Sequence, residues 1–314
     1  MSEWVSAFAP ASIGNVAVGF DMLGLALEGV GDRVFARRTG SDRVSVLEVR
    51  GLDGELHPYL STNAESNTAS IAAQAFWDDH GDEGSVELKV HKGVPLQSGM
   101  GSSAASAVAA VVAANGLLGS PLPLDKLLLY ALEGEKYASG GLHADNVAPS
   151  LLGGLVLCPQ VLLPQVLHLP SPSGVSAALI HPDLQVNTAH ARRGLARSYA
   201  TKAWLEQQGL LAGFIAACHT GDVDLIGRTL RDVIIEPQRK DNVPCFDVVK
   251  AAAERGGALG CSLSGSGPSI FALCRSADAR NIASAMEQAC RSQGIGCESW
   301  VSALDAPGAR IETA

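Results

Sequence analysis

The chain has 314 residues, of which 47% are apolar and 18% are charged, and its net charge is −9. This composition indicates a well-packed globular protein of one large or two medium domains and excludes a disordered chain. No run of Lys and Arg is longer than two residues, so we expect neither nucleic acid nor an anionic membrane as a partner.

The first half of the chain mixes predicted strands with predicted helices. Strands are expected over residues 4–11, 33–38, 44–49 and 86–91. Helices are expected over residues 67–78, 102–118, 125–138 and 147–152. Turns at 29–31 and 40–41 separate the first three strands, and Asn67 is the expected N-cap of the first helix.

The pattern changes after Gly153-Gly154, where two short strands enclose a Pro-rich stretch. Strands are expected over residues 155–158, 177–180, 258–263, 269–274 and 296–303. Helices are expected near residues 200–220, 223–234, 246–255 and 277–292. We therefore predict an α+β protein with two domains, residues 1–153 and residues 154–314.

The seven cysteines are scattered and include no C-x-x-C pair, which indicates free thiols in a reducing compartment. The first residues lack the basic-then-apolar pattern of a signal peptide. No uncharged apolar run approaches the ~20 residues that a membrane span requires. We therefore expect a cytoplasmic protein.

Residues 95–105 form the most informative segment. Gly99 and Gly101 lead into Ser102 and Ser103, and a long apolar run follows. A glycine loop that opens a helix offers backbone N–H groups and the positive end of the helix dipole, which suits a phosphate. The segment is neither a Walker A motif nor a dinucleotide-binding fingerprint. A serine that only caps a buried helix explains the same residues equally well, so both interpretations stay open.

A carboxylate in an otherwise apolar helix is the second candidate. Glu133 and Glu135 cannot serve one site together, because residues two apart point to different sides of a helix. An inward Glu135 is costly unless it is paired or binds Mg²⁺, which proteins hold with one or two carboxylates and substrate phosphates. The alternative is a solvated carboxylate near the helix end.

Three further segments place polar side chains in turns. The segment His143-Ala144-Asp145-Asn146 follows two glycines and indicates a substrate cluster, unless one of its residues only caps the next helix. Asn15 and Asp21 flank glycines in an apolar stretch, which indicates either a loop against a pocket or an Asx-turn. Residues 262–268 predict a hairpin turn, which matters for function only where it faces the first glycine loop.

Together these segments resemble the ordered motifs of the GHMP kinases. Pro95–Ala104 is similar to the family's Pro-x-x-x-Gly-Leu-Gly-Ser-Ser-Ala string, and Met100 is its one departure, a swap that conserves volume. Residues 265–268 match the family's last motif. The likeness to the branch that phosphorylates L-homoserine rests on residues 9–15, 19–21, 143–149, 188–192 and 236–239.

The resemblance implies a ribosomal-S5-like N-terminal domain and a ferredoxin-like C-terminal domain, with the active site between them. It implies an enzyme that transfers the γ-phosphate of ATP to the hydroxyl of L-homoserine, on the route from aspartate to threonine. Dimers are common in the family, so the resemblance leaves a homodimer open.

The resemblance also assigns a nucleotide site. Mg²⁺ is expected at Ser103 and Glu135, and Asn67 is expected near the adenine. The other expected ATP contacts are Pro95, Leu96, Gln97, Ser98, Gly99, Met100, Gly101, Ser102, Ser103, Ala104 and Ala105.

A substrate site follows from the same resemblance. Its expected residues are Asn15, Asp21, His143, Asn146, Arg192 and Arg239. A substrate carboxylate calls for guanidinium groups, which form bidentate pairs with carboxylates, and Arg192 and Arg239 supply them. The substrate's ammonium and hydroxyl groups call for acceptors, which the other four residues offer. This set favours an amino acid over a sugar or mevalonate.

The expected catalytic residues are Ser103, Glu135, Asp145 and Arg192. Some members of the family use an Asp base that a Lys assists, but the first 88 residues of this chain contain no Lys. We therefore expect positioning and charge stabilisation to provide most of the catalysis, with Asp145 as a general base as the alternative.

Three other functions compete with this one. A serine hydrolase would use Ser102 or Ser103 with His143 and Asp145, but the G-x-S-x-G elbow is absent. A relative that only binds its ligands would have lost the magnesium chemistry, yet Glu135 is in place. A decarboxylase of the same superfamily would lack the two arginines.

Overall fold

Two β-sheets organise the chain in the computed structural model, which describes residues 3–81 and 83–312. The first sheet has the order β11-β1-β2-β4-β3, and β5 and β6 extend it beside β2. Its strands are β1 (Val5–Gly14), β2 (Leu23–Thr39), β3 (Ser45–Arg50), β4 (Ser85–His91), β5 (Leu155–Leu157), β6 (Leu167–His168) and β11 (Arg310–Glu312). The second sheet, β10-β7-β9-β8, consists of β7 (Val175–Pro182), β8 (Gly260–Leu263), β9 (Ile270–Arg275) and β10 (Cys297–Ala303).

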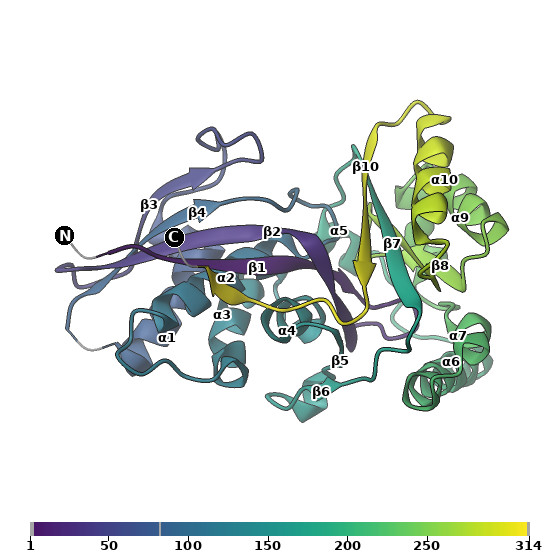
Figure 1. Cartoon of the computed structure of the whole chain (residues 1–314), viewed down its shortest axis with the longest axis horizontal. Coiled ribbons are helices and arrows are strands. Elements are labelled where there is room, and N and C mark those ends of the chain that lie inside the picture. The colour runs from purple at the N-terminus through teal and green to yellow at the C-terminus, as the bar shows by residue number, and fades with distance from the viewer. Residues whose placement is uncertain (1–2, 82, 313–314) are drawn as a thin grey trace.

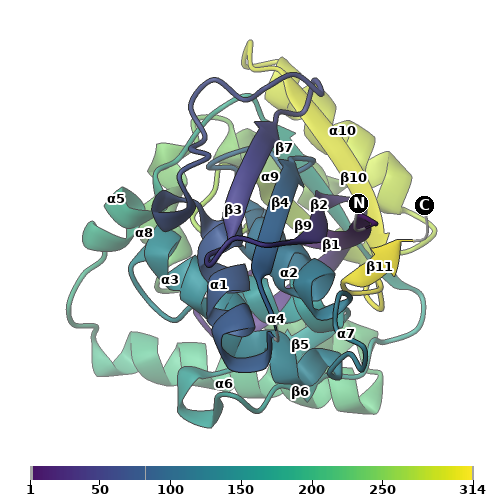
Figure 2. The ribbon, with the colours of Figure 1, turned by 90° about the vertical axis from the view of Figure 1, so that its left-hand side faces the viewer.

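Four helices cover one face of the first sheet (Figures 1 and 2). They are α1 (Thr68–His80), α2 (Ser102–Asn115), α3 (Leu128–Ser139) and α4 (Ala144–Leu152). Helix α2 lies between the sheet and its neighbours α1 and α3, and it is buried along its whole length from Ala104 to Asn115. Its Ala and Val side chains are small enough for close packing on every side. The predicted buried helix is therefore confirmed.

The second sheet packs helices on both faces. The helices of this half are α5 (Thr188–Arg193), α6 (Thr201–Thr220), α7 (Val223–Thr229), α8 (Glu236–Arg239), α9 (Phe246–Arg255) and α10 (Ala279–Arg291). Helices α9 and α10 cover its outer face (Figure 1). On the inner face, Leu179 of β7 and Phe271 of β9 join one apolar cluster with Leu25 of β2 and Phe214 of α6. This shared core fixes the two sheets relative to each other, and the predicted α+β architecture is confirmed.

The predicted turn at residues 29–31 is wrong, because β2 runs through it without a break. Gly31 pairs with Pro10 of β1, and the register then shifts so that Ser12 pairs with Ala26. Glu28 and Gly29 lie on the exposed side of this irregularity. These residues have the local composition of a turn, but pairing with an antiparallel neighbour keeps them in the strand as a bulge.

Two boundaries also differ from the sequence-based ones. The helix predicted over 223–234 ends at Thr229, because the Asp232 carboxylate accepts the N–H groups of residues 234–236 and starts a new turn. Strands β5 and β6 follow residue 153 but pair within the first sheet, and β11 returns to β1 from the far end of the chain. The division into residues 1–153 and 154–314 stays a prediction.

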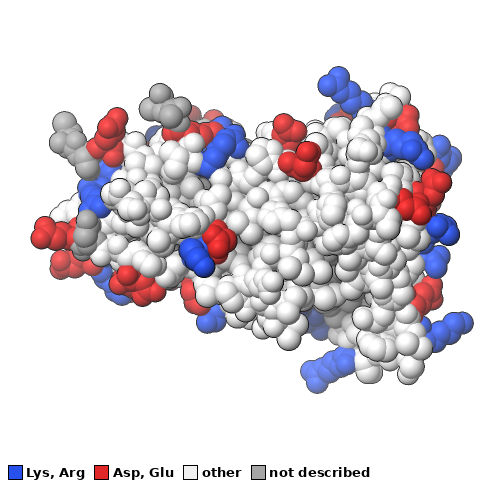
Figure 3. Space-filling view, turned by 60° about the horizontal axis from the view of Figure 1, so that its bottom comes forward, with Lys and Arg blue, Asp and Glu red and all other residues white. Residues whose placement is uncertain are grey.

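The surface carries its charges unevenly. In Figure 3, Lys and Arg are interspersed with Asp and Glu toward the two ends of the molecule, and the middle of this face is mostly uncharged. Every helix in the described ranges is too short or too polar to cross a bilayer.

Candidate functional site

A glycine loop joins β4 to the start of α2. Gly101 is the N-cap residue of α2, its φ is +69°, and no side chain caps the helix. Ser102 Oγ instead donates to the carbonyl of Val94, and Ser103 Oγ donates to Glu135 Oε2. The capping interpretation is therefore wrong. The first turn of α2 therefore has no side-chain cap, and Gly101, Ser102 and Ser103 line the cleft, an arrangement that suits an anion.

The predicted hairpin turn between β8 and β9 faces this loop. Ser264 Oγ donates to the carbonyl of Gly99 at 2.7 Å. Gly99 has φ +76°, and a Cβ there would overlap the backbone carbonyl of Ser264. A Cβ on Gly101 would overlap Ser12 Oγ of β1. The two glycines are therefore required by close approach as well as by their left-handed backbone.

A cleft of about 380 Å³ runs along the glycine loop between the two halves of the chain. This volume lies within the roughly 300–1,000 Å³ typical of small-molecule sites. Most of the predicted site residues line it. The exceptions are Met100, Ala104 and Ala105, which are fully buried behind the loop, and Pro95, which lines a neighbouring cavity.

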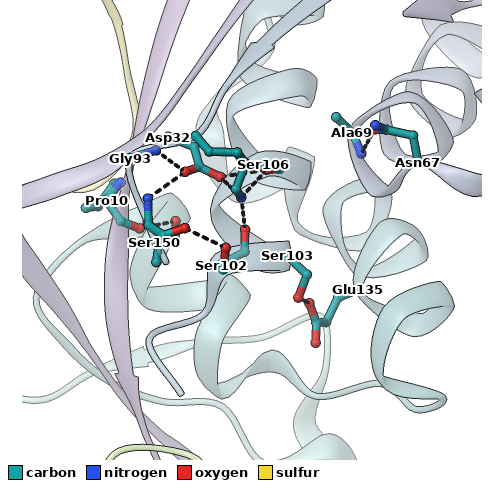
Figure 4. A network of polar contacts seen from close by, with 12 residues as sticks. Pro10, Asp32, Asn67, Ala69, Gly93, Ser102, Ser103, Ser106, Glu135 and Ser150 are labelled. Carbon is teal, nitrogen blue, oxygen red and sulfur yellow. Dashed lines mark hydrogen bonds and ion pairs between the residues drawn. The ribbon is translucent and has the colours of Figure 1, made fainter. Parts of the chain in front are cut away.

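Asn67 lies at one end of the cleft. Its Oδ1 accepts the N–H groups of Ala69 and Ser70, and its Nδ2 donates to the carbonyl of Ser61. The predicted N-cap is therefore confirmed. Figure 4 shows Asn67 well apart from Ser103 and Glu135, so the cleft is long enough to separate a base from its phosphates.

Ser103 and Glu135 meet where α2 begins. Their oxygens lie 2.6 Å apart, and Glu135 is only 6% exposed (Figure 4). Glu133, in contrast, is half exposed beside Lys136. The solvated alternative thus fits Glu133 and is wrong for Glu135. A hydroxyl and a buried carboxylate are ligands that Mg²⁺ accepts. The described residues contain no group of three or more His, Cys, Asp or Glu that could hold a metal ion.

The turn after β1 carries Asn15 and Asp21 against the cleft. Asn15, Val16 and Ala17 all have positive φ, between 43° and 69°. Each such non-glycine residue costs roughly 1–2 kcal/mol. Asn15 secures the turn, because its Oδ1 accepts the N–H of Asp21 and its Nδ2 donates to the carbonyl of Gly265. The predicted loop against a pocket is confirmed, because Asn15 and Asp21 both line the cleft, and strained backbone of this kind is common at functional sites.

Asp21 is paired inside the protein. Arg192 donates both terminal nitrogens to its two carboxylate oxygens at 2.6 and 2.8 Å. His143 Nδ1 lies 3.7 Å from the same carboxylate. Burial lowers the pKa of His143, and the nearby charge of Asp21 opposes that shift only in part. Asp21 is thus the anchor of an arginine in addition to being a candidate acceptor for substrate.

Arg239 is the most unusual side chain of the cleft. It is 3% exposed, and one terminal nitrogen donates to the carbonyl of Gly265 at 3.0 Å. Within the described part of the chain it forms no ion pair, and its Nε has no hydrogen-bond partner. Burial, and then the neighbouring Arg192, lower its pKa. Arg192 Nε is also buried without a partner. A buried, unpaired guanidinium calls for an anion from the ligand.

Asp145 faces the arginines from the start of α4. Helix α4 begins at Ala144 with His143 as N-cap, so the predicted capping by Asp145 or Asn146 is wrong. Asp145 Oδ2 accepts the N–H of Asn15, while Oδ1 is buried without a partner. Burial, and then the charges of Asp21 and Glu135, raise the pKa of Asp145 to about 7. Asn146 Oδ1 accepts a hydrogen bond from Ser12 Oγ.

The sequence-based reasoning missed Lys92 and Asp32, which form a buried ion pair next to the start of α2 (Figure 4 shows Asp32). Lys92 lines the cleft, and Nζ also donates to the carbonyl of Ser102 and to Ser106 Oγ, both at 2.8 Å. One signal was available. Lys92 ends an alternating strand directly before the glycine loop, and a charged residue buried there needs a partner.

Two family models match the chain. The model of the GHMP kinases N-terminal domain matches residues 67–154, and the model of the GHMP kinases C-terminal region matches residues 214–292. Together they span more than half of the chain and include the glycine loop, Glu135 and the β8–β9 turn.

Relatives extend the likeness to nearly the whole chain. A homoserine kinase of Xanthomonas campestris pv. campestris (strain B100) is 42% identical over 306 residues, 97% of this chain and 93% of the relative. A homoserine kinase of Chlorobium phaeobacteroides (strain BS1) is 42% identical over 320 residues, 98% of this chain and 99% of the relative.

Solved structures agree with these relatives. A crystal structure of homoserine kinase from Cytophaga hutchinsonii ATCC 33406 has a TM-score of 0.94 and 42% identity, covering 99% of this chain and 98% of that chain. A mevalonate kinase of L. major has a TM-score of 0.69 at 15% identity, covering 98% of this chain and all of that chain, and it shows only a shared fold.

Proposed function

The chain belongs to the homoserine kinases of the GHMP kinase family, and on this premise we propose that it transfers the γ-phosphate of ATP to the hydroxyl of L-homoserine. The product, O-phospho-L-homoserine, serves the synthesis of threonine from aspartate. The observation that carries the proposal is the buried guanidinium of Arg239, which has no ion pair among the described residues. An α-carboxylate is the anion that an amino-acid substrate brings.

Arg239 and Arg192 would bind that carboxylate together. Both Nε–H groups are buried without acceptors, and a carboxylate can accept from two guanidinium groups at once. The ammonium group of the substrate would lie toward Asp21, His143 and Asn15, which line the same cleft and offer acceptors. A mevalonate-type substrate would leave this second set without a cation to bind.

The start of α2 would bind the phosphates of ATP. Its N–H groups carry no side-chain cap, and Gly99 and Gly101 let the backbone approach the ligand. Asn67 would lie near the adenine, at the other end of the cleft. Ser103 and Glu135 fit Mg²⁺, which would neutralise charge on the phosphates when bound.

We propose that orientation, more than proton abstraction, provides most of the rate. Phosphoryl transfer passes through a loose transition state, in which the attacking hydroxyl loses its proton late. Asp145 lines the same cleft, and its Oδ1 has no hydrogen-bond partner among the described residues, so it would receive this proton. In this account Asp145 contributes to the rate without being essential for it.

A coupled assay of ADP release tests the function. The substrates are L-homoserine, L-serine, mevalonate and galactose, each with ATP and Mg²⁺. We expect L-homoserine to exceed the others in kcat/KM by about 100-fold or more, because a carboxylate, an ammonium group and chain length are recognised together. Preferred turnover of mevalonate or galactose would contradict the proposal, and turnover of none would favour a protein that only binds its ligands.

Compartment and assembly are further proposals. Seven buried free thiols favour a reducing compartment, so we propose that the enzyme acts in the cytoplasm.

The weakly charged middle of the face in Figure 3 supports a homodimer, because interface cores are depleted in charge. Light scattering at several protein concentrations tests this, and a mass of one chain throughout would exclude it.

A further inference from the structure

One aromatic ring lies under both arginines of the cleft. The guanidinium carbon of Arg239 is 5.1 Å from the centroid of the Phe20 ring, and that of Arg192 is 5.3 Å from it. The two arginines come from different helices, α8 and α5, and Phe20 comes from the turn after β1. Three distant segments of the chain thus meet at a single ring.

Phe20 partly compensates for the cost of bringing two like charges together. Arg239 forms no ion pair with a carboxylate in the described ranges, and burial, followed by the charge of Arg192, lowers its pKa. The face of an aromatic ring carries partial negative charge and attracts a cation within about 6 Å. Asp21 forms an ion pair with Arg192 and acts on Arg239 only through its more distant charge, whereas the Phe20 ring lies within 5.3 Å of both guanidinium carbons.

The backbone fixes the ring in place. Gly19 and Asp21 flank Phe20, and Asp21 has φ +56°. The N–H of Gly19 donates to the carbonyl of Asn15, and the N–H of Asp21 donates to Asn15 Oδ1. The strained turn therefore fixes the position of the Phe20 ring relative to the Asp21 carboxylate. A merely apolar contact would not require this strain.

We propose that Phe20 is a positioning residue that sets specificity for a carboxylate-bearing substrate, by holding Arg192 and Arg239 side by side. This inference rests on the proposed function of the cleft. Without the ring the two guanidinium groups would separate, and the substrate carboxylate would lose one of its two partners. Nucleotide binding and phosphoryl transfer would continue, because Phe20 lies outside the loop and the magnesium residues.

Steady-state kinetics with two substrates tests the proposal. Phe20→Leu keeps an apolar side chain and removes the ring, while Phe20→Tyr keeps the ring. Each variant is assayed with L-homoserine and with its carboxamide analogue, which lacks the negative charge. We expect Phe20→Leu to raise KM for L-homoserine about tenfold, with kcat and KM for ATP unchanged within about twofold. Its kcat/KM for the carboxamide should stay at the wild-type value, and Phe20→Tyr should retain the wild-type KM.

A matched control is Phe35→Leu, since Phe35 is a partly buried ring on β2 whose ring centroid lies 4.9 Å from that of His91. Its KM values should not change. Equal losses for both substrates, a fall in kcat alone, or a Phe20→Leu enzyme that behaves as Phe35→Leu does would each overturn the inference. If Phe20→Leu does not fold, Phe20→Met provides the same comparison. A wild-type enzyme without activity on L-homoserine would instead refute the proposed function, before any variant is made.

Discussion

Lys92 Nζ contacts the carboxylate of Asp32 directly behind the glycine loop, and both side chains are buried. Asp32 Oδ1 also accepts the N–H groups of Gly93 and Val94, where β4 ends. Lys92 reaches across to the carbonyl of Ser102, where α2 begins. This pair therefore connects the two ends of the loop (Figure 4 shows Asp32, Gly93 and Ser102).

Asp32→Asn should destabilise the protein by about 3–5 kcal/mol, because it leaves the buried Lys92 ammonium without its counter-ion. KM for ATP should also rise, since the loop loses its anchor. Urea unfolding and steady-state kinetics measure the two effects. The control is Glu65→Gln, which removes an ion pair with Arg43 whose side chains are 75% and 79% exposed and should cost only about 0–1 kcal/mol. Similar losses in the two variants would contradict this role.

Glu135→Gln should reduce kcat by at least about 100-fold, since it removes the carboxylate that would hold Mg²⁺. The Mg²⁺ concentration for half-maximal activity should rise as well. Glu133→Gln is the matched control two residues away in the same helix, and its exposed pair with Lys136 should change activity by no more than about twofold. A magnesium titration of both variants measures the difference. Unchanged magnesium dependence in Glu135→Gln would remove Glu135 from the metal site.

Gly99→Ala should raise KM for ATP by about tenfold or more, because a Cβ there would push the loop away from the Ser264 carbonyl. Gly54→Ala provides the control. Gly54 has φ +79°, close to that of Gly99, but a Cβ there would meet no atom within 4 Å. The comparison thus separates the steric effect from the backbone strain that both variants share. If both variants bind ATP equally well, the close packing of the loop is unimportant.

Asp145→Asn should stabilise the metal-free protein increasingly as the pH rises. Burial raises the pKa of Asp145 to about 7, so the native state retains a proton that the unfolded chain releases near pH 4. The wild type therefore loses stability between about pH 4 and pH 7, by up to about 4 kcal/mol, and the variant does not. Urea unfolding at pH 4 and pH 8 with a chelator measures this. A difference between the two proteins that does not depend on pH would contradict it.

The same variant separates the two mechanisms. Because orientation is proposed to provide most of the rate, Asp145→Asn should retain substantial turnover, well above that of Glu135→Gln. Single-turnover kinetics at saturating L-homoserine compares the two variants directly. A loss in Asp145→Asn as deep as that in Glu135→Gln would make Asp145 an essential base.

Much of the site could be predicted because its signals are local. The glycine loop before α2 and the N-cap Asn67 follow from short patterns in the sequence, whereas for Glu135 the local pattern left an inward and a solvated carboxylate open, and the family resemblance favoured the inward one. One local pattern gave a wrong prediction. Gly29–Gly31 has the composition of a turn, but pairing of β2 with β1 keeps the strand continuous. The decisive influence there was a partner strand, which no short window contains.

The remaining features depend on contacts between distant segments. Asp21 and Arg192 are 171 residues apart in the chain. Because they pair, the Asp21 carboxylate holds this arginine in place, whereas the sequence suggested only an acceptor for substrate. The raised pKa of Asp145 follows from burial, which depends on how α4 packs against the turn at Asn15. Asp32 lies on β2 and Lys92 directly follows β4, and the pairing of Arg33 with His91 brings the two residues together.

The most direct test of the central claim is phosphorus NMR of the products formed from ATP with L-homoserine and with its carboxamide analogue. The account predicts a phosphomonoester signal with L-homoserine. It also predicts a rate at least about 100-fold lower with the carboxamide at equal low concentrations, because Arg239 then lacks its anion. Equal rates with the two substrates, or ATP consumption without a phosphomonoester from L-homoserine, would contradict it.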